Sequence, residues 1–290
     1  MNKGIIYGLT AYALWGFLPI YWKFLQDVPA TEILAHRMAW SLVFVVGLLA
    51  VRQRWAWVKP AVRDQRTVLI YLFASLFLAL NWGVYIWAVN NDFIIETSLG
   101  YFINPLVNVL FGFLFFGERL RPGQLAAVAT AACGVLYLTI SYGTLPWIAL
   151  TLAFSFGTYG VLKKKAPLES LEGFSLETAL LFLPAVAYLL YLEVQGAGSF
   201  GHVSIGTTAL LGLTGIATAV PLLFFAAAAR RATLTALGIM QYIAPTLQFL
   251  LGVFLYAEPF SQRQLIGFVL IWTALLIYTA ESFIHSRQPA

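Results

Sequence analysis

Polar side chains with helical spacing interrupt several apolar segments of this chain, and these are the residues that could do chemistry. Tyr101, Asn104 and Asn108 are spaced i, i+3 and i+7, so they share one face of a helix. Polar groups inside apolar helices usually face a cavity or a partner helix. The stripe therefore predicts either the lining of a solute-binding site or hydrogen bonding between helices.

A matching stripe occurs in the second half of the chain, where Gln241, Ala244 and Gln248 have the same spacing. Pro105 corresponds in the same way to Pro245. A proline inside a helix removes one backbone hydrogen bond, which can leave a carbonyl group free for a ligand or simply kink the helix. Two related polar faces are what a central binding site would need.

A second group consists of ionisable residues inside apolar segments. We expect Arg37 to attract an anionic group such as a carboxylate, and Glu177, at the equivalent position in the second half, to take a cation or a proton. His36 is a further candidate for proton exchange. Each of Arg37 and Glu177 lies near one end of its segment, but at opposite ends, so about 15 Å of membrane depth would separate them. We therefore expect separate roles, with snorkelling to the interface as the alternative.

A third group combines aromatic rings with an amide. Asn81 and Tyr85 share a helical face at i and i+4, next to Trp82, and Trp15 lies in an earlier segment. Aromatic walls suit a flat or apolar solute, although ordinary packing explains them equally well.

Two glutamates follow related segments at their ends. Glu118 and Glu258 occupy equivalent positions in the two halves and are expected to form gates with nearby basic loops. Exposed ion pairs add little stability, so their role would lie in switching. The three histidines and one cysteine have no metal-ligand spacing, and we expect neither a metal nor a cofactor.

The elements that position these residues must be membrane helices. Of the 290 residues, 61% are hydrophobic and only 10% are charged, whereas soluble domains carry about 25% charged residues. Each apolar run is long enough to cross a bilayer and lacks the alternation of a barrel strand. The sequence predicts an all-α integral membrane protein of ten transmembrane helices, at about 4–25, 32–51, 68–89, 97–116, 122–141, 145–162, 174–193, 207–229, 234–256 and 264–283.

Lysine and arginine residues gather in alternate connections between these spans. Only Lys23 and Arg263 fall on the opposite side, and Arg37 lies within a span. This bias predicts that both termini are cytoplasmic. It also explains the net charge of +5 without nucleic acid.

An internal repeat organises the spans. Residues 102–120 align with residues 242–260, and the matches include Gly112 with Gly252. Residues 1–141 and 142–290 are therefore predicted to be two five-helix repeats. Because five is odd, the second repeat enters the membrane inverted, an arrangement typical of transporters in which one site opens to each side in turn.

Several stretches carry a resemblance to a known family: AYALWGFLPIYWK (11–23), PATEILAHRMAWS (29–41), NWGVYIWAVNN (81–91), ETSLGYFINPLVN (96–108), FGERL (116–120) and QYIAPTLQFL (241–250). They resemble the RarD family of permeases, in the EamA branch of the drug/metabolite transporter superfamily. The resemblance implies two EamA-type repeats, a bacterial inner-membrane location, and export of a metabolite or drug.

These observations favour a secondary transporter of a small solute over two alternatives. The chain has no G-x-x-x-x-G-K-[ST] motif, so we expect no nucleotide-driven step, and proton exchange and facilitated diffusion both remain open. A membrane-embedded enzyme acting on lipids is the first alternative, although no span carries paired carboxylates. A membrane assembly protein without a solute path is the second. Small residues in 124–138 permit a homodimer contact or internal packing.

Overall fold

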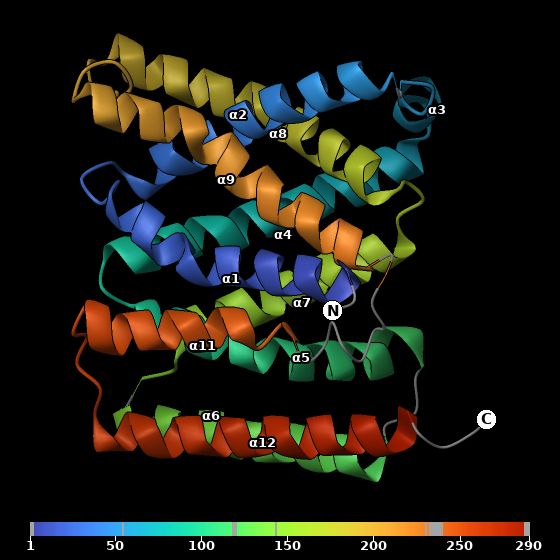
Figure 1. Ribbon diagram of the computed structural model, residues 1–290, viewed down its shortest axis with the longest axis vertical. Helices are drawn as coiled ribbons and strands as arrows, with labels where there is room; N and C mark the ends of the chain where they lie inside the picture. Colours follow the sequence, from blue (N-terminus) through green and yellow to red (C-terminus); the bar gives the residue numbers. More distant parts are fainter. Residues whose placement is uncertain are drawn as a thin grey trace.

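In the computed structural model, residues 3–53, 55–117, 121–142, 144–229, 231 and 240–286 are described, and these residues contain helices but no strands (Figure 1). The helices are α1 (Lys3–Lys23), α2 (Ala30–Arg52), α3 (Val58–Arg63), α4 (Gln65–Asn90), α5 (Ile94–Phe116), α6 (Pro122–Tyr142), α7 (Trp147–Lys165), α8 (Ser170–Val194), α9 (Ile205–Ala229), α11 (Ile243–Leu250) with the π-helical turn η1 (Leu251–Leu255), and α12 (Gln262–Ser286).

Eight of the described helices are long and apolar enough to cross a membrane: α1, α2, α4, α5, α6, α8, α9 and α12. The predicted span at 145–162 corresponds to α7, a shorter helix of 19 residues with three lysines in its last turn. Of the predicted span at 234–256, residues 240–256 are described, and they contain the apolar stretch Ile243–Leu255. An all-helical membrane protein is confirmed, whereas the count of ten spans stays a prediction.

The helices lie side by side across the long axis of the molecule, and their ends form two opposite faces (Figure 1). Helices α6 and α12 pack together at one extreme of that axis, and α2, α8 and α9 lie at the other. Between these extremes, α7 packs on both α5 and α4. Helix α1 packs on both α11 and α9. The start of α1 and the end of α12 lie on the same face.

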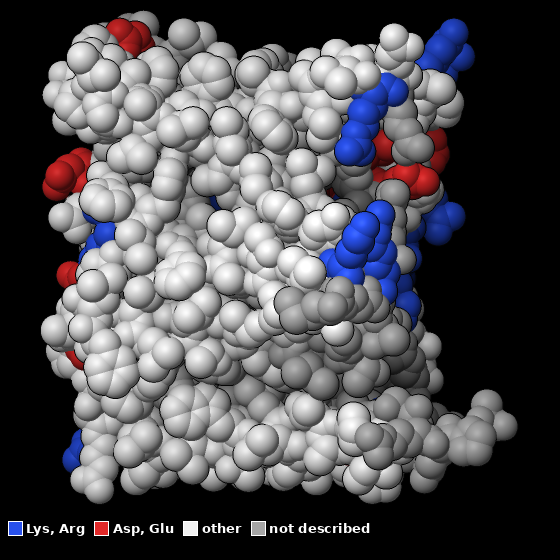
Figure 2. Space-filling model, viewed as in Figure 1, with Lys and Arg blue, Asp and Glu red and all other residues white. Residues whose placement is uncertain are grey.

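Charged side chains lie mainly on these two faces, and the belt between them is almost free of charge (Figure 2). In this view most of the visible lysine and arginine lies on the face where α1 begins. Large apolar side chains in the middle of the helices are exposed, among them Leu183 of α8 at 74% and Leu276 of α12 at 70%. Exposed apolar surface of this extent fits contact with lipid rather than water.

Glycines allow two of the closest helix contacts. A side chain on Gly215 of α9 would lie only 2.4 Å from the backbone of Trp40 on α2, and one on Gly100 of α5 would lie 2.8 Å from the carbonyl oxygen of Ala149 on α7. These contacts bring α2 against α9 and α5 against α7, which places Arg37 and Tyr101 in the interior.

The connection between α2 and α4 holds a short helix that the sequence did not predict, α3. Asp64 follows it and caps α4 by accepting hydrogen bonds from the backbone N–H groups of Arg66 (3.3 Å) and Thr67 (3.2 Å) and from the Thr67 hydroxyl. The Thr67 hydroxyl bond is the main reason that the pKa of the Asp64 carboxyl lies below its ordinary value.

Candidate functional site

Arg37 is the buried charge around which the candidate site is built. Its side chain comes from α2 and the residue is only 3% exposed. The guanidinium carbon lies 3.6 Å from the centre of the Trp82 ring and 5.2 Å from that of Trp22, and both distances allow cation–π attraction. Its Nε donates a hydrogen bond of 2.8 Å to the hydroxyl of Thr218 on α9.

The guanidinium is left partly unpaired. Arg37 Nη1 is buried and has no hydrogen-bond partner among the described residues, and Arg37 forms no ion pair with a described carboxylate. A guanidinium offers five N–H donors, and a buried charge is costly unless it is paired. Arg37 is therefore suited to receive an anion.

Three tyrosine side chains lie near this charge. Tyr21, Tyr85 and Tyr101, from α1, α4 and α5, lie close enough to interact with Arg37 electrostatically. The Tyr85 and Tyr101 rings meet edge to face with their centres 5.7 Å apart. The Tyr85 hydroxyl is buried without a partner among the described residues, so it is a second polar group available to a solute.

Asn81 joins this cluster to α7. Its Nδ2 donates to the Leu152 carbonyl oxygen (2.9 Å) and to the Ser155 hydroxyl (3.0 Å). Its Oδ1 accepts a long hydrogen bond of 3.4 Å from the Tyr101 hydroxyl. Asn81 thus holds α4 against α7 and orients Tyr101.

The remaining stripe on α5 also turns toward α7. Asn104 donates a hydrogen bond of 3.4 Å to the Ala153 carbonyl oxygen, and its own Oδ1 accepts one of 2.9 Å from Asn108. Asn108 is exposed. Asn104 makes the bond between helices that the alternative interpretation expects, whereas Asn108 bonds, among the described residues, only within α5.

The matching residues on α11 belong to a different cluster. Gln248 is buried and donates to the Trp15 carbonyl oxygen (3.2 Å), while its Oε1 has no partner among the described residues. The Trp15 ring lies 5.7 Å from that of Phe225 and 5.5 Å from that of Tyr12. Gln241 is partly exposed just before α11. Gln248 and the rings of Trp15, Tyr12 and Phe225 form a second aromatic and amide cluster between α1, α9 and α11.

Glu177 is paired within its own half of the chain. Its carboxylate accepts hydrogen bonds from Lys163 Nζ (2.9 Å) and from the Tyr159 hydroxyl (3.2 Å), and the residue is 1% exposed. Arg37 and Glu177 therefore have different partners, as expected from their depths. The sequence offered a signal for Lys163, because it is the counterpart of Lys23 in the second half of the chain.

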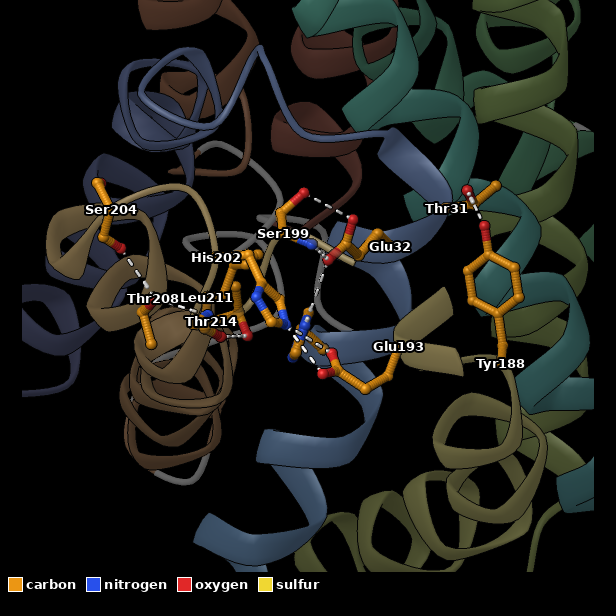
Figure 3. Close-up of polar contacts among 12 residues, drawn as sticks. Thr31, Glu32, Tyr188, Glu193, Ser199, His202, Ser204, Thr208, Leu211 and Thr214 are labelled. Carbon is orange, nitrogen blue, oxygen red and sulfur yellow. Dashed lines mark hydrogen bonds and ion pairs between the residues drawn. The ribbon is translucent and has the colours of Figure 1, made fainter. Parts of the chain in front are cut away.

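The connection between α8 and α9 is fastened over the first turn of α2 (Figure 3). Glu32 accepts hydrogen bonds from the backbone N–H (2.6 Å) and hydroxyl (2.9 Å) of Ser199. The ring of His36 stacks on Phe200 at 5.0 Å, and neither of its nitrogens has a hydrogen-bond partner among the residues described. Because His36 precedes Arg37, this connection covers the chain directly beside the candidate site.

Glu258 binds a helix terminus. Its two carboxylate oxygens accept hydrogen bonds from the backbone N–H groups of Ile94 (2.7 Å) and Ile95 (2.8 Å) at the start of α5. This contact links the two predicted repeats at one face of the bundle. Glu118 lies outside the described residues.

The residues that sequence reasoning missed are Trp22, Tyr21 and Thr218. Trp22 and Tyr21 lie in a segment rich in aromatic residues, where the sequence distinguishes no single ring. Threonine is common in apolar helices, where its hydroxyl bonds to its own backbone, and Thr218 also does this by donating to the Thr214 carbonyl oxygen. No sequence signal separates it from the other threonines.

Comparison with known proteins places the chain among membrane transporters. The model of the EamA-like transporter family matches residues 2–140 and 145–280. The chain is 47% identical to the "Protein RarD" of Streptomyces exfoliatus over 288 residues, which is 99% of this chain and 91% of that protein. It is also 47% identical to the "Uncharacterized transporter YojE" of Bacillus subtilis over 282 residues, covering 96% and 94% of the two chains.

A solved crystal structure shares the fold. It superposes with a TM-score of 0.59 at 21% identity and covers 95% of this chain and 97% of its own. At this identity the likeness concerns the arrangement of the helices.

Proposed function

The chain belongs to the EamA-like transporter family, as a RarD-type member of the drug/metabolite transporter superfamily, and on that premise we propose that it carries a small carboxylate-bearing solute across the membrane. The observation that carries the proposal is the buried guanidinium of Arg37, whose Nη1 has no partner among the described residues. Guanidinium groups bind carboxylates through paired, charge-assisted hydrogen bonds. The carboxylate of the solute would complete the pairing of Arg37.

The buried carboxylates of the described residues support this assignment because each is paired with a group other than Arg37. Glu32 holds Ser199, Glu177 holds Lys163, and Glu258 holds the start of α5. A buried charge without a fixed counter-ion carries a desolvation penalty of several kcal/mol. Arg37 has no counter-ion among the described residues, which supports a mobile anionic solute as its partner.

The surroundings of Arg37 define the rest of the proposed site. Trp82 provides a flat wall, and the unpaired hydroxyl of Tyr85 can donate a hydrogen bond to the solute, while the Tyr101 hydroxyl can accept one. Asn81 positions Tyr101, and Asn104 with Asn108 continues the polar lining along α5. Gln241 and Gln248 would form the related lining in the second half, and Trp15 of α1 would lie beside Gln248.

We further propose alternating access by two inverted repeats, residues 1–141 and 142–290. The packing supports this. A shift of 140 residues relates α5 to α11 and α1 to α7, and the contact of α5 with α7 therefore has a counterpart in the contact of α11 with α1. The two separate matches to one family model also support it. The distribution of lysine and arginine supports cytoplasmic termini in a bacterial inner membrane.

Two contacts are the proposed gates. The ion pair of Glu177 with Lys163 would close one end, and the contact of Glu258 with the start of α5 would close the other. Glu118 keeps its predicted gating role. Protonation of Glu177 would release Lys163, and His36 is the second candidate proton carrier, so both belong to the proposed coupling path.

The test is uptake into proteoliposomes of small carboxylates, each compared with its neutral amide. We expect saturable uptake of a carboxylate and not of its amide. The uptake should be lost in Arg37→Lys, which keeps the charge but not the forked geometry, and retained in Arg263→Lys on the exposed face. Equal transport of acid and amide, or full activity in Arg37→Lys, would remove Arg37 from the site.

The same liposomes test proton coupling and the proposed role of Asn104. An imposed pH gradient that accelerates wild-type uptake, but not uptake by Glu177→Gln, would support proton exchange. An unaltered rate would indicate facilitated diffusion. Asn104→Ala should raise KM if the stripe on α5 lines the path. Absence of saturable flux for every compound would favour an assembly protein without a solute path.

A further inference from the structure

A cavity of about 230 Å³ lies at the face of the bundle where α4 meets α5 and α6 leads into α7. Its lining includes Trp87, Phe93, Glu96, Trp147 and Gln264. It is smaller than the roughly 300–1,000 Å³ of sites that enclose drug-sized ligands. It is also several times the ~30 Å³ that one water molecule occupies in the liquid. The space suits a single small chemical group.

One wall of the cavity is aromatic. The rings of Trp87 and Phe93 stack with their centres 5.8 Å apart and an interplanar angle of 14°. The Trp147 ring lies 5.6 Å from that of Trp87. Aromatic faces carry negative electrostatic potential, and clusters of such rings bind alkylated ammonium groups.

The charge in the cavity has the sign that complements a cation. Glu96, in the first turn of α5, is partly buried and makes no hydrogen bond or ion pair with a described residue. None of the described residues that line the cavity is lysine, arginine or histidine. The nearby backbone N–H groups of Ile94 and Ile95 donate to Glu258. Among the described residues, the Glu96 carboxylate thus has neither a cationic side chain in the cavity nor these two backbone N–H groups as a partner.

A favourable position at a helix N-terminus accounts for a negative charge on Glu96, but it does not account for the aromatic wall or for the cavity. Glu172 provides a comparison, since it also lies in the first turn of a helix, α8, but outside this cavity.

We propose that this cavity is a binding site for an organic ammonium group, held by the Glu96 carboxylate and the rings of Trp87, Phe93 and Trp147. The group can belong to a free small amine or to the head group of a lipid such as phosphatidylethanolamine, because both present the same chemistry. The site is separate from the Arg37 site, which has the opposite charge.

Thermal unfolding of the purified protein in detergent tests this assignment independently of transport. Tetramethylammonium chloride is titrated against sodium chloride at equal ionic strength, and phosphatidylethanolamine is compared with phosphatidylglycerol of the same acyl chains. A ligand that binds only the folded state raises Tm in a saturable manner. The variants are Glu96→Gln and Trp147→Leu, with Glu172→Gln as the matched control.

We expect at least one ammonium probe to raise the Tm of the wild type and of Glu172→Gln. Glu96→Gln and Trp147→Leu should each need at least tenfold more probe for the same shift. A response to phosphatidylethanolamine alone would identify a lipid head group, and a response to tetramethylammonium would identify a free amine as sufficient. The proposal fails if neither probe shifts the wild type, if Glu96→Gln responds equally, or if phosphatidylglycerol acts as well as phosphatidylethanolamine, which would assign the cavity to acyl chains.

Discussion

Replacing Arg37 with methionine separates a binding role of this residue from a structural one. Arg37→Met keeps a long side chain against Trp82 and Trp22 but removes the charge and the donors. If Arg37 serves a solute, the variant loses binding while the solute-free protein keeps its stability. If Arg37 holds the fold together, stability falls.

The contacts of Arg37 give the contributions to the free energy of unfolding that the variant loses and gains. The variant loses one charged hydrogen bond to Thr218, about 1.5–3 kcal/mol, and cation–π attraction of about 2 kcal/mol. Thr218 keeps its hydrogen bond to the Thr214 carbonyl oxygen, so no buried hydroxyl is left unpaired. Against these losses stands the desolvation of a buried guanidinium without a fixed counter-ion, which is several kcal/mol. The expected change in the free energy of unfolding is close to zero or stabilising.

Binding should change far more. Removal of one partner of a buried, hydrogen-bonded charge pair costs about 2–5 kcal/mol of binding free energy. That corresponds to a loss of affinity of about 30-fold to several thousand-fold.

Two assays on the same preparation measure the two effects. Thermal unfolding without solute reports stability, and saturation of uptake, or solute-induced stabilisation, reports affinity. Arg263→Met, at an exposed arginine, is the control and should change neither. A Tm that falls by many degrees in Arg37→Met without solute, or an affinity that stays within threefold of the wild type, would refute the reasoning.

Three further predictions concern stability. Lys163→Met should destabilise the protein by about 3–5 kcal/mol because it leaves the carboxylate of Glu177 buried without its cation, and Lys163→Met combined with Glu177→Gln should recover most of this loss in a chemical unfolding series. Gly215→Ala should cost about 1–3 kcal/mol, because its methyl group would overlap the Trp40 backbone; an unchanged Tm would contradict the close contact. Asp64→Ala should lower Tm at neutral pH. Because the folded-state pKa of Asp64 is depressed, its contribution is present above the unfolded-state pKa and is lost as the pH falls through the folded-state pKa, so the Tm difference between variant and wild type should narrow between about pH 5 and pH 3.

The helices were largely predictable from the sequence because each follows from a local property. A run of about 20 apolar residues has one stable form in lipid, a helix that satisfies its own backbone. The predicted segment 97–116 lies within α5, Ile94–Phe116, and the predicted segment 32–51 lies within α2, Ala30–Arg52. Helix α3 was missed because six residues in a charged connection carry no apolar period.

The partners of the polar residues were not predictable in this way. Spacing places Asn81 and Tyr85 on one helical face, but it does not reveal that Asn81 bonds to α7 while the Tyr85 hydroxyl stays unpaired among the described residues. The sequence places Glu177 inside an apolar segment and Glu258 just after one, but it names no partner for either. One binds a lysine side chain and the other binds backbone N–H groups.

The amino-acid sequence by itself determined the membrane as solvent, the helical class, the likeness between the two halves and the short list of polar residues at membrane depth, because composition and period act over a few turns of one helix. Only the tertiary structure decided which of those residues pair and which stay available. Pairing depends on which helices approach closely, as α2 does with α9 at Gly215, and on distances of a few ångströms between residues far apart in the chain. Arg37 and Thr218 are separated by 181 positions, and their contact, together with the unpaired Nη1 beside it, exists only after the helices have packed.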